Sequence, residues 1–151
     1  MSRETAATLH RFALRVYYED TDAGGIVYYA NYLKFAERAR TEMLRDFGLP
    51  PERLAREAGI GLVVRRAAIE FLAPARLDDA LVVTTQVLAH AGATLDLAQE
   101  VERCGATLVR LDIRIACLGA GGRPTRLPPA LVAAIASLSP KEPMMVDAHD
   151  R

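Results

Sequence analysis

Residues 107–117 show the most regular two-residue alternation in the chain. Apolar side chains occupy every second position from 109 to 115, and the positions between them carry two arginines and one aspartate. Successive side chains of a β-strand point to opposite faces of a sheet, so this segment is predicted to be a half-buried strand. The fold must therefore contain a sheet that turns one face to a core.

Other segments have the same character, through alternation or through enrichment in β-branched residues: 12–19, 63–71, 81–88 and 95–102. Turn-forming residues at 74–75, 90–93 and 104–105 separate the last four strands. Connections this short join antiparallel neighbours, because parallel strands need a long crossover. We therefore expect five antiparallel strands.

A long helix is predicted between the first strand and the other four. Its apolar stripe consists of Tyr32, Ala36, Ala39, Met43 and Phe47. Asn31 is the expected N-cap, and Gly48 with the two prolines after Leu49 ends the helix. Shorter helices are predicted at 51–58, ending at Gly59, and at about 129–138.

The order of these elements predicts an α+β fold, with a five-stranded antiparallel sheet wrapped around the long helix. A chain of 151 residues suits one domain, which we assign to residues 1–139. Residues 140–151 are expected to form a flexible tail.

The charge balance excludes several classes of partner. The chain has 19 basic and 19 acidic residues, and its arginines are scattered, so we expect no binding to nucleic acid. The sequence has no apolar leader and no stretch that would span a bilayer, which favours a cytoplasmic protein. Cys104 and Cys117 lack metal-site spacing and are expected to be buried in strands, and no metal is expected. His10, His90 and His149 have no evident partners.

Residues 17–32 form an unusual loop, YYEDTDAGGIVYYANY. Asp20 and Asp22 are two residues apart, so their side chains should point to opposite sides, one to a site and the other into the loop. Gly24 and Gly25 permit positive φ and close approach of a ligand. The N-terminus of the long helix follows at once and offers unpaired N–H groups.

A carboxylate beside such a helix end is suited to attack on an activated carbonyl. Asp22 would act as a nucleophile or as a base on water, while helix N–H groups stabilise the oxyanion. A purely structural alternative remains at this point, in which the loop is an Asx-turn followed by an N-cap and the tyrosines only pack.

The segment YYEDTDAGGIVYYANYLKFAERARTEML resembles the signature of the 4-hydroxybenzoyl-CoA thioesterase family, which has the hotdog fold. It is most similar to the YbgC-like branch associated with the Tol-Pal cell-envelope system. The resemblance implies that Asp22 is catalytic and that a backbone N–H near Tyr29 holds the oxyanion. The implied substrate-binding residues are Gly25, Ile26, Val27, Tyr28, Tyr29 and Asn31.

Two features depart from that branch. Many of its members have His at the position of Tyr29, so a mechanism that depends on Asp22 alone is favoured, and an aromatic acyl group stays open. Family members can hold the CoA phosphates with basic residues at the turn corresponding to 90–93, which has no Arg or Lys here. Arg65 and Arg66 are candidates for that contact.

The resemblance further implies an acyl-CoA substrate, no cofactor, and homodimers joined edge to edge that commonly pair into homotetramers. Three alternatives remain: a thioesterase for acyl-carrier-protein substrates, one for hydroxybenzoyl-type CoA thioesters, and a non-catalytic subunit that binds acyl-CoA or a cell-envelope partner.

Overall fold

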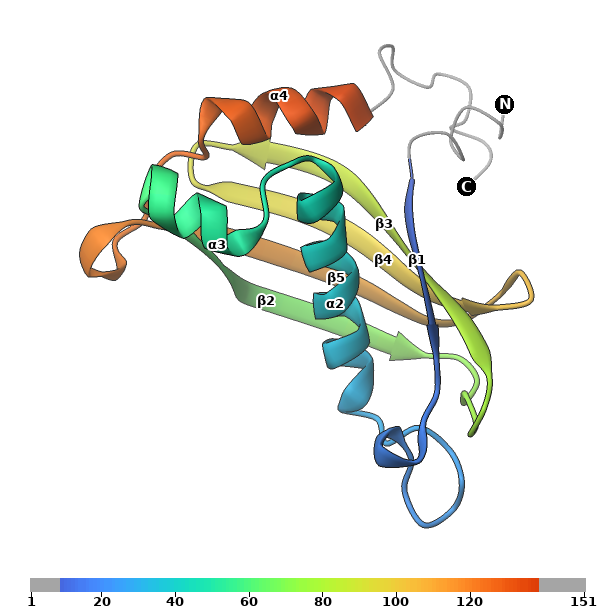
Figure 1. The fold of residues 1–151 in the computed structure, drawn as a ribbon. Coiled ribbons are helices and arrows are strands. Elements are labelled where there is room, and N and C mark those ends of the chain that lie inside the picture. The colour runs from blue at the N-terminus through green and yellow to red at the C-terminus, as the bar shows by residue number, and fades with distance from the viewer. Residues whose placement is uncertain (1–8, 139–151) are drawn as a thin grey trace.

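The computed structural model describes residues 9–138, and within them it contains a five-stranded sheet (Figure 1). The strands are β1 (His10–Arg15), β2 (Gly61–Phe71), β3 (Ala80–Ala91), β4 (Thr94–Arg103) and β5 (Ala106–Leu118). Their order in the sheet is β1-β3-β4-β5-β2, and all neighbours are antiparallel. The predicted α+β class and sheet are confirmed.

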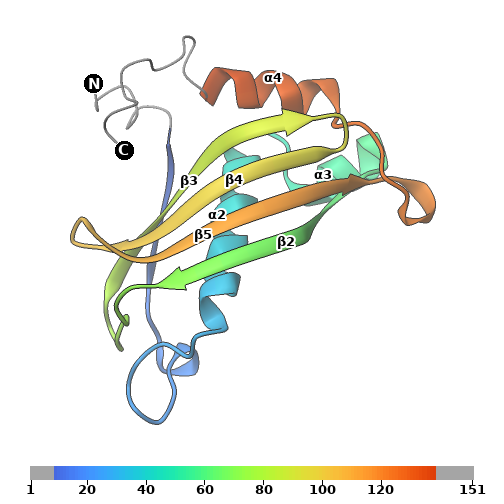
Figure 2. The same ribbon diagram turned by 180° about the vertical axis from the view of Figure 1, so that it is seen from behind.

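The long helix α2 (Asn31–Asp46) lies across one face of the sheet, and the opposite face carries no helix in the view from behind (Figure 2). The next helix, α3 (Pro51–Arg53), continues as a π-helical turn at Leu54–Ala58 and ends at Gly59, where φ is +66°. A third helix, α4 (Pro129–Leu138), follows β5. A bond of 2.9 Å from the Leu127 amide to the Gly92 carbonyl fixes the segment before α4 to the β3–β4 turn.

The core lies between α2 and the sheet. The predicted stripe of α2 is buried from Tyr32 to Met43, and Phe35 and Leu44 widen it. The alternation in β5 is also confirmed, because Val109, Leu111, Ile113 and Ile115 are all buried.

A buried glutamine joins α2 to the sheet. Gln99 of β4 is only 1% exposed. Its amide donates to the Ala36 carbonyl at 3.1 Å and to the Thr85 hydroxyl at 2.9 Å, and its oxygen accepts from Arg40 at 3.0 Å. A buried polar group needs such partners, and these ones fix the helix over the middle strands and orient Arg40.

The first strand ends earlier than predicted. It was expected to reach residue 19, but β1 ends at Arg15 and a 3-10 turn occupies Tyr18–Asp20. The Asp20 carboxylate accepts the Tyr17 amide at 2.8 Å, and the Asp20 amide donates to the Tyr17 carbonyl at 3.0 Å. These local bonds outweigh the strand preference of the alternating sequence.

The expectation that Asn31 caps α2 is wrong. Ala30 is the N-cap residue and makes no side-chain cap, whereas Asn31 is the first helical residue. The Asn31 amide group instead donates to the Asp20 carbonyl at 2.9 Å, so it ties the helix start to the preceding turn.

Two further expectations need correction. Cys104 is exposed at the β4–β5 turn, where its φ of +51° and that of Gly105, +83°, suit a two-residue hairpin loop. Cys117 is buried as expected, and burial raises the pKa of its thiol.

His10 does have a partner, because its Nε2 lies 2.8 Å from the Asp46 carboxylate. His90 lies exposed in β3.

Some predictions concern residues outside the described range, namely the boundary at 139, the flexible tail and the placement of His149. Across residues 9–138, no helix has the length and apolar character that a bilayer crossing requires. The same residues contain no group of three or more side chains arranged to hold a metal ion.

Candidate active site

Asp20 anchors the loop between β1 and α2. Its side chain is buried, and its carboxylate holds the Tyr17 amide. Its carbonyl accepts the Tyr28 amide at 2.9 Å and the Asn31 side chain at 2.9 Å. Asp20 therefore joins both ends of the loop to the start of α2, which is the bracing role expected for one of the two aspartates.

The segment between Asp20 and Tyr28 folds back on itself. Thr21 pairs with Val27, and the Asp22 amide donates to the Ile26 carbonyl at 2.9 Å. Gly25, with φ of +83°, makes the turn that this reversal requires. As a result, residues 20–22 run beside residues 26–28, close to the helix start.

The Asp22 side chain lies at the exposed end of this turn. Its Oδ1 accepts the Gly24 amide at 2.8 Å, which is an Asx-turn. Among residues 9–138 no group donates to Oδ2, so that oxygen is available to a substrate or a water molecule. A side chain at position 24 would place its Cβ only 3.3 Å from Oδ1, so the carboxylate can approach closely because residue 24 is glycine.

The start of α2 offers two free amides. The Asn31 amide donates to the Tyr28 carbonyl at 2.8 Å and the Leu33 amide to the Ala30 carbonyl at 3.2 Å. Within the described residues, the Tyr29 and Ala30 amides have no backbone acceptor. They lie at the positive end of a 16-residue helix without a side-chain cap, which suits them to an oxyanion.

Exposed aromatic rings surround this helix start. Tyr28 is 48% and Tyr29 62% exposed, and their ring centroids are 4.9 Å apart. The Tyr29 ring also meets Phe71, at the end of β2, edge to face at 6.2 Å. Large exposed apolar groups mark interaction surfaces, so this cluster indicates a ligand or a second chain.

Sequence reasoning missed the segment that supports the loop. Between β2 and β3, the Ala75 carbonyl accepts the Val27 amide at 2.8 Å, and the Leu77 amide donates to the Gly25 carbonyl at 3.3 Å. Asp79 holds this segment, because its Oδ2 accepts the Arg76 amide at 2.8 Å and the Arg103 guanidinium at 2.7 Å. Asp79 and Arg103 are 24 residues apart, so no local sequence pattern predicts that they form a pair.

The Asp79–Arg103 pair makes stability depend on pH. Burial disfavours the Asp79 carboxylate, but the Arg76 amide and the Arg103 charge outweigh it and hold the pKa below its usual value. A lowered pKa adds stability at neutral pH that is lost as the pH falls below about 4. We therefore expect Asp79→Asn to lower the free energy of unfolding at pH 7, by an amount that shrinks in acid.

Urea titrations from pH 3 to pH 7 measure this difference. The control is Asp112→Asn, because Asp112 is exposed on β5 and makes no side-chain hydrogen bond within residues 9–138. A loss for Asp79→Asn that stayed constant across the pH range would contradict the assignment.

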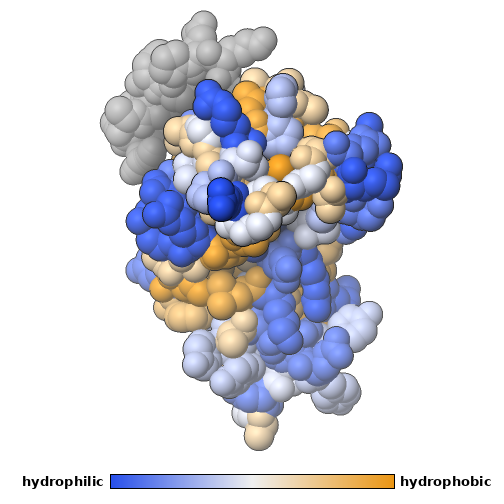
Figure 3. All heavy atoms as spheres, turned by 90° about the vertical axis from the view of Figure 1, so that its left-hand side faces the viewer, coloured by the Kyte–Doolittle hydropathy of each residue, from blue (hydrophilic) through white to orange (hydrophobic). Residues whose placement is uncertain are grey.

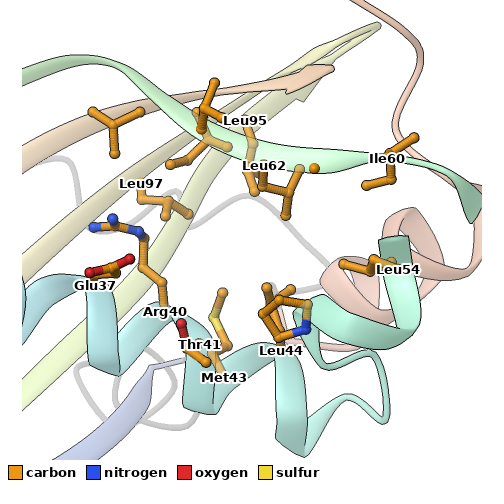
Figure 4. Close-up of a pocket in the computed structure, with 15 residues that line it drawn as sticks. Glu37, Arg40, Thr41, Met43, Leu44, Leu54, Ile60, Leu62, Leu95 and Leu97 are labelled. Carbon is orange, nitrogen blue, oxygen red and sulfur yellow. The ribbon is translucent and has the colours of Figure 1, made fainter. Parts of the chain in front are cut away.

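A second feature lies at the other end of α2. A cavity of about 370 Å³ opens between α2 and the beginning of β2, and Figure 4 shows its lining. Most lining side chains are apolar, and the charged ones are Glu37 and Arg40. On the side of the molecule that carries α3 and the start of β2, hydrophobic surface gathers in the centre (Figure 3).

The structure thus brings some predicted site residues together and not others. Gly25, Ile26, Tyr28, Tyr29 and Asn31 gather around the turn that carries Asp22, whereas Val27 is buried beneath it. None of these residues lines the cavity, because they belong to the opposite end of α2. Arg65 and Arg66 lie exposed on β2, and their predicted contact with CoA phosphates stays a prediction.

Comparisons with known proteins identify the family of this chain. A family model described as the thioesterase-like superfamily matches residues 16–135. The acyl-CoA thioester hydrolase YbgC of Escherichia coli O6:H1 is 42% identical over 128 residues, which cover 83% of this chain and 95% of that protein. A crystal structure from Bartonella henselae, described as a probable thioesterase, is 38% identical with a TM-score of 0.76, covering 80% of this chain and 99% of that one.

A more distant structure has the same fold. It is a variant of 4-hydroxybenzoyl-CoA thioesterase in complex with 4-hydroxybenzoyl-CoA, and it superposes with a TM-score of 0.79 at 22% identity. The alignment covers 85% of this chain and 99% of that one. At this level of identity the similarity shows the fold alone.

Proposed function

This chain belongs to the thioesterase-like superfamily, and on that basis we propose that it cleaves acyl-CoA thioesters with the Asp22 carboxylate and an amide at the start of α2. It has the hotdog fold and is an acyl-CoA thioesterase, a hydrolase that converts an acyl-CoA and water into a free acid and CoA. The observation that carries the mechanism is the free Asp22 oxygen on a turn that leads directly into an uncapped helix start.

Two routes use the same groups. In the first, Asp22 Oδ2 bonds to the thioester carbon, the C–S bond breaks, and the CoA thiolate leaves and takes a proton from solvent. Water then cleaves the anhydride and restores the carboxylate. In the second, Asp22 takes a proton from the attacking water and passes it to the departing sulfur. In both, the Tyr29 amide donates to the oxygen that gains negative charge.

The working unit is proposed to be a homodimer joined through β2. Within residues 9–138 this strand pairs only with β5, so its other edge is open. Val63, Val64 and Phe71 are exposed along it. A long open edge with apolar side chains favours pairing with another strand, and a second copy supplies an identical one.

An assay with a panel of thioesters tests the proposal. Purified protein is given aliphatic acyl-CoAs, hydroxybenzoyl-CoA and an acyl-carrier-protein thioester, and the released thiol is measured over time. We expect turnover of acyl-CoA, and the exposed Tyr28 and Tyr29 rings favour including the aromatic substrate. Binding of acyl-CoA without any turnover would support the non-catalytic alternative instead.

Several finer expectations stay predictions. They are the absence of a cofactor, the cytoplasmic location, the pairing of dimers into homotetramers, and the link to the Tol-Pal system or to an acyl carrier protein. The proposed mechanism itself requires no metal or redox group, because the carboxylate, the amide and water supply each step.

A further inference from the structure

The cavity between α2 and β2 has a feature that the catalytic proposal does not use. Arg40 lies half-buried in its wall, and in Figure 4 its guanidinium extends from α2 beside Glu37. The remaining lining includes Leu44, Leu62 and Leu97. A volume of about 370 Å³ lies within the range of roughly 300–1,000 Å³ that is typical of small-molecule sites.

Arg40 has unused hydrogen-bonding capacity. A guanidinium carries five N–H donors. Among residues 9–138, the one side-chain hydrogen bond of Arg40 runs to a neutral acceptor, Gln99 Oε1, and no carboxylate forms an ion pair with it. Burial lowers the pKa of Arg40, and the charge of Glu37 only partly opposes this effect. A partly desolvated cation with free donors is suited to an oxygen acceptor on a ligand.

Within one chain the cavity and the catalytic turn are displaced from each other along β2, although along α2 the lining residue Glu37 lies only six residues, or roughly 9 Å, beyond Asn31. The Tyr29 ring contacts Phe71 at the end of β2, whereas the cavity is lined by β2 residues only as far as Val64. The separation is 71 − 64 = 7 residues, or roughly 23 Å at about 3.3 Å per residue.

A second copy removes this separation. A strand that pairs antiparallel with its own copy is reversed end for end, so the start of one β2 lies beside the end of the other. The cavity of one copy then opens beside Phe71 and Tyr29 of the second copy. Each catalytic turn would therefore meet the cavity of the opposite chain.

In the proposed homodimer each cavity would receive the acyl group cleaved by Asp22 of the other copy, and we infer that Arg40 of that cavity selects acyl groups with an oxygen acceptor at their far end. This inference rests on the proposed thioesterase function and deepens it by naming the substrate class. The acceptor is a carboxylate or a hydroxyl, and Glu37 can accept a hydrogen bond from the hydroxyl.

The first test compares three acyl-CoAs of equal length: hexanoyl-CoA, 6-hydroxyhexanoyl-CoA and adipoyl-CoA. We expect the wild-type kcat/KM to be at least tenfold higher for one of the two oxygen-bearing substrates than for hexanoyl-CoA. Glu37→Gln should raise the rate for adipoyl-CoA relative to the hydroxyl substrate, because it removes a negative charge. A wild-type enzyme that hydrolyses hexanoyl-CoA as well as or better than both overturns the inference and leaves the proposed function standing.

The second test uses Arg40→Met, which keeps an unbranched, flexible side chain and removes the charge. We expect the tenfold preference for the oxygen-bearing substrate over hexanoyl-CoA to disappear in this variant. The control is Arg45→Met, because Arg45 lies exposed five residues further along α2, outside the cavity. If Arg40→Met does not fold, the wild-type comparison still decides the matter. A wild type that cleaves no thioester would defeat the proposed function itself.

Mixed dimers test the crossing between chains. Asp22→Asn and Arg40→Met chains with different tags are co-expressed, and the species carrying both tags is purified. If the site is shared, its one active centre combines Asp22 of one chain with Arg40 of the other and has wild-type selectivity at about half the rate. Selectivity like that of Arg40→Met would place cavity and carboxylate in the same chain and overturn the inference.

Discussion

Asp22→Asn is expected to lower kcat for acyl-CoA hydrolysis by about 10²–10⁴, which is the usual contribution of a positioned general base. The amide keeps an oxygen that can accept the Gly24 N–H, so the Asx-turn should survive. What it loses is the negative charge needed to attack the carbonyl or to take a proton from water. Stopped-flow measurement of thiol release under single-turnover conditions would show the loss.

Asp78→Asn is a matched control for this variant. Asp78 is also exposed, lies in the segment that supports the loop, and has a φ of +72°, which asparagine tolerates. It should keep wild-type kcat. If Asp22→Asn hydrolysed acyl-CoA at the wild-type rate with an unchanged melting temperature, the role assigned to this carboxylate would be wrong.

Tyr29→Pro is expected to lower kcat by about 10²–10³, the usual effect of losing one oxyanion donor. Proline removes the backbone N–H that has no acceptor among the described residues. Tyr29→Phe keeps that N–H and the ring that meets Phe71, so it should retain activity within a few-fold. The pair therefore separates the amide from the side chain, and circular dichroism checks that α2 still forms.

Ala30→Pro identifies which of the two free amides matters. The φ of Ala30 is −71°, within the range that proline adopts. If the Tyr29 amide is the donor, Ala30→Pro should cost much less than Tyr29→Pro. The reverse order would move the oxyanion donor one residue along the chain.

The loop shows how far sequence reasoning reached at the site. The prediction that the two aspartates have different roles follows from their spacing, and Asp20 does brace the loop through the Tyr17 amide. The prediction that Asn31 is the N-cap was wrong. Asparagine favours the N-cap position in general, but here its side chain donates to the Asp20 carbonyl instead. A side-chain bond that caps a helix and a side-chain bond to a nearby carbonyl have similar energies, so sequence alone does not decide which of them forms.

By itself the sequence determined the approximate positions of the strands, the helices and the turns between them, together with the glycine-containing turn that carries Asp22 before α2. These features depend on side-chain periodicity and backbone preferences over a few residues, and both can be read from the local sequence. The tertiary structure decided the strand order that leaves β2 at an edge, the Asp79–Arg103 pair that steadies the loop, and the position of Arg40 in a cavity. Each of these joins residues far apart in sequence, and such contacts exist only after the chain has packed.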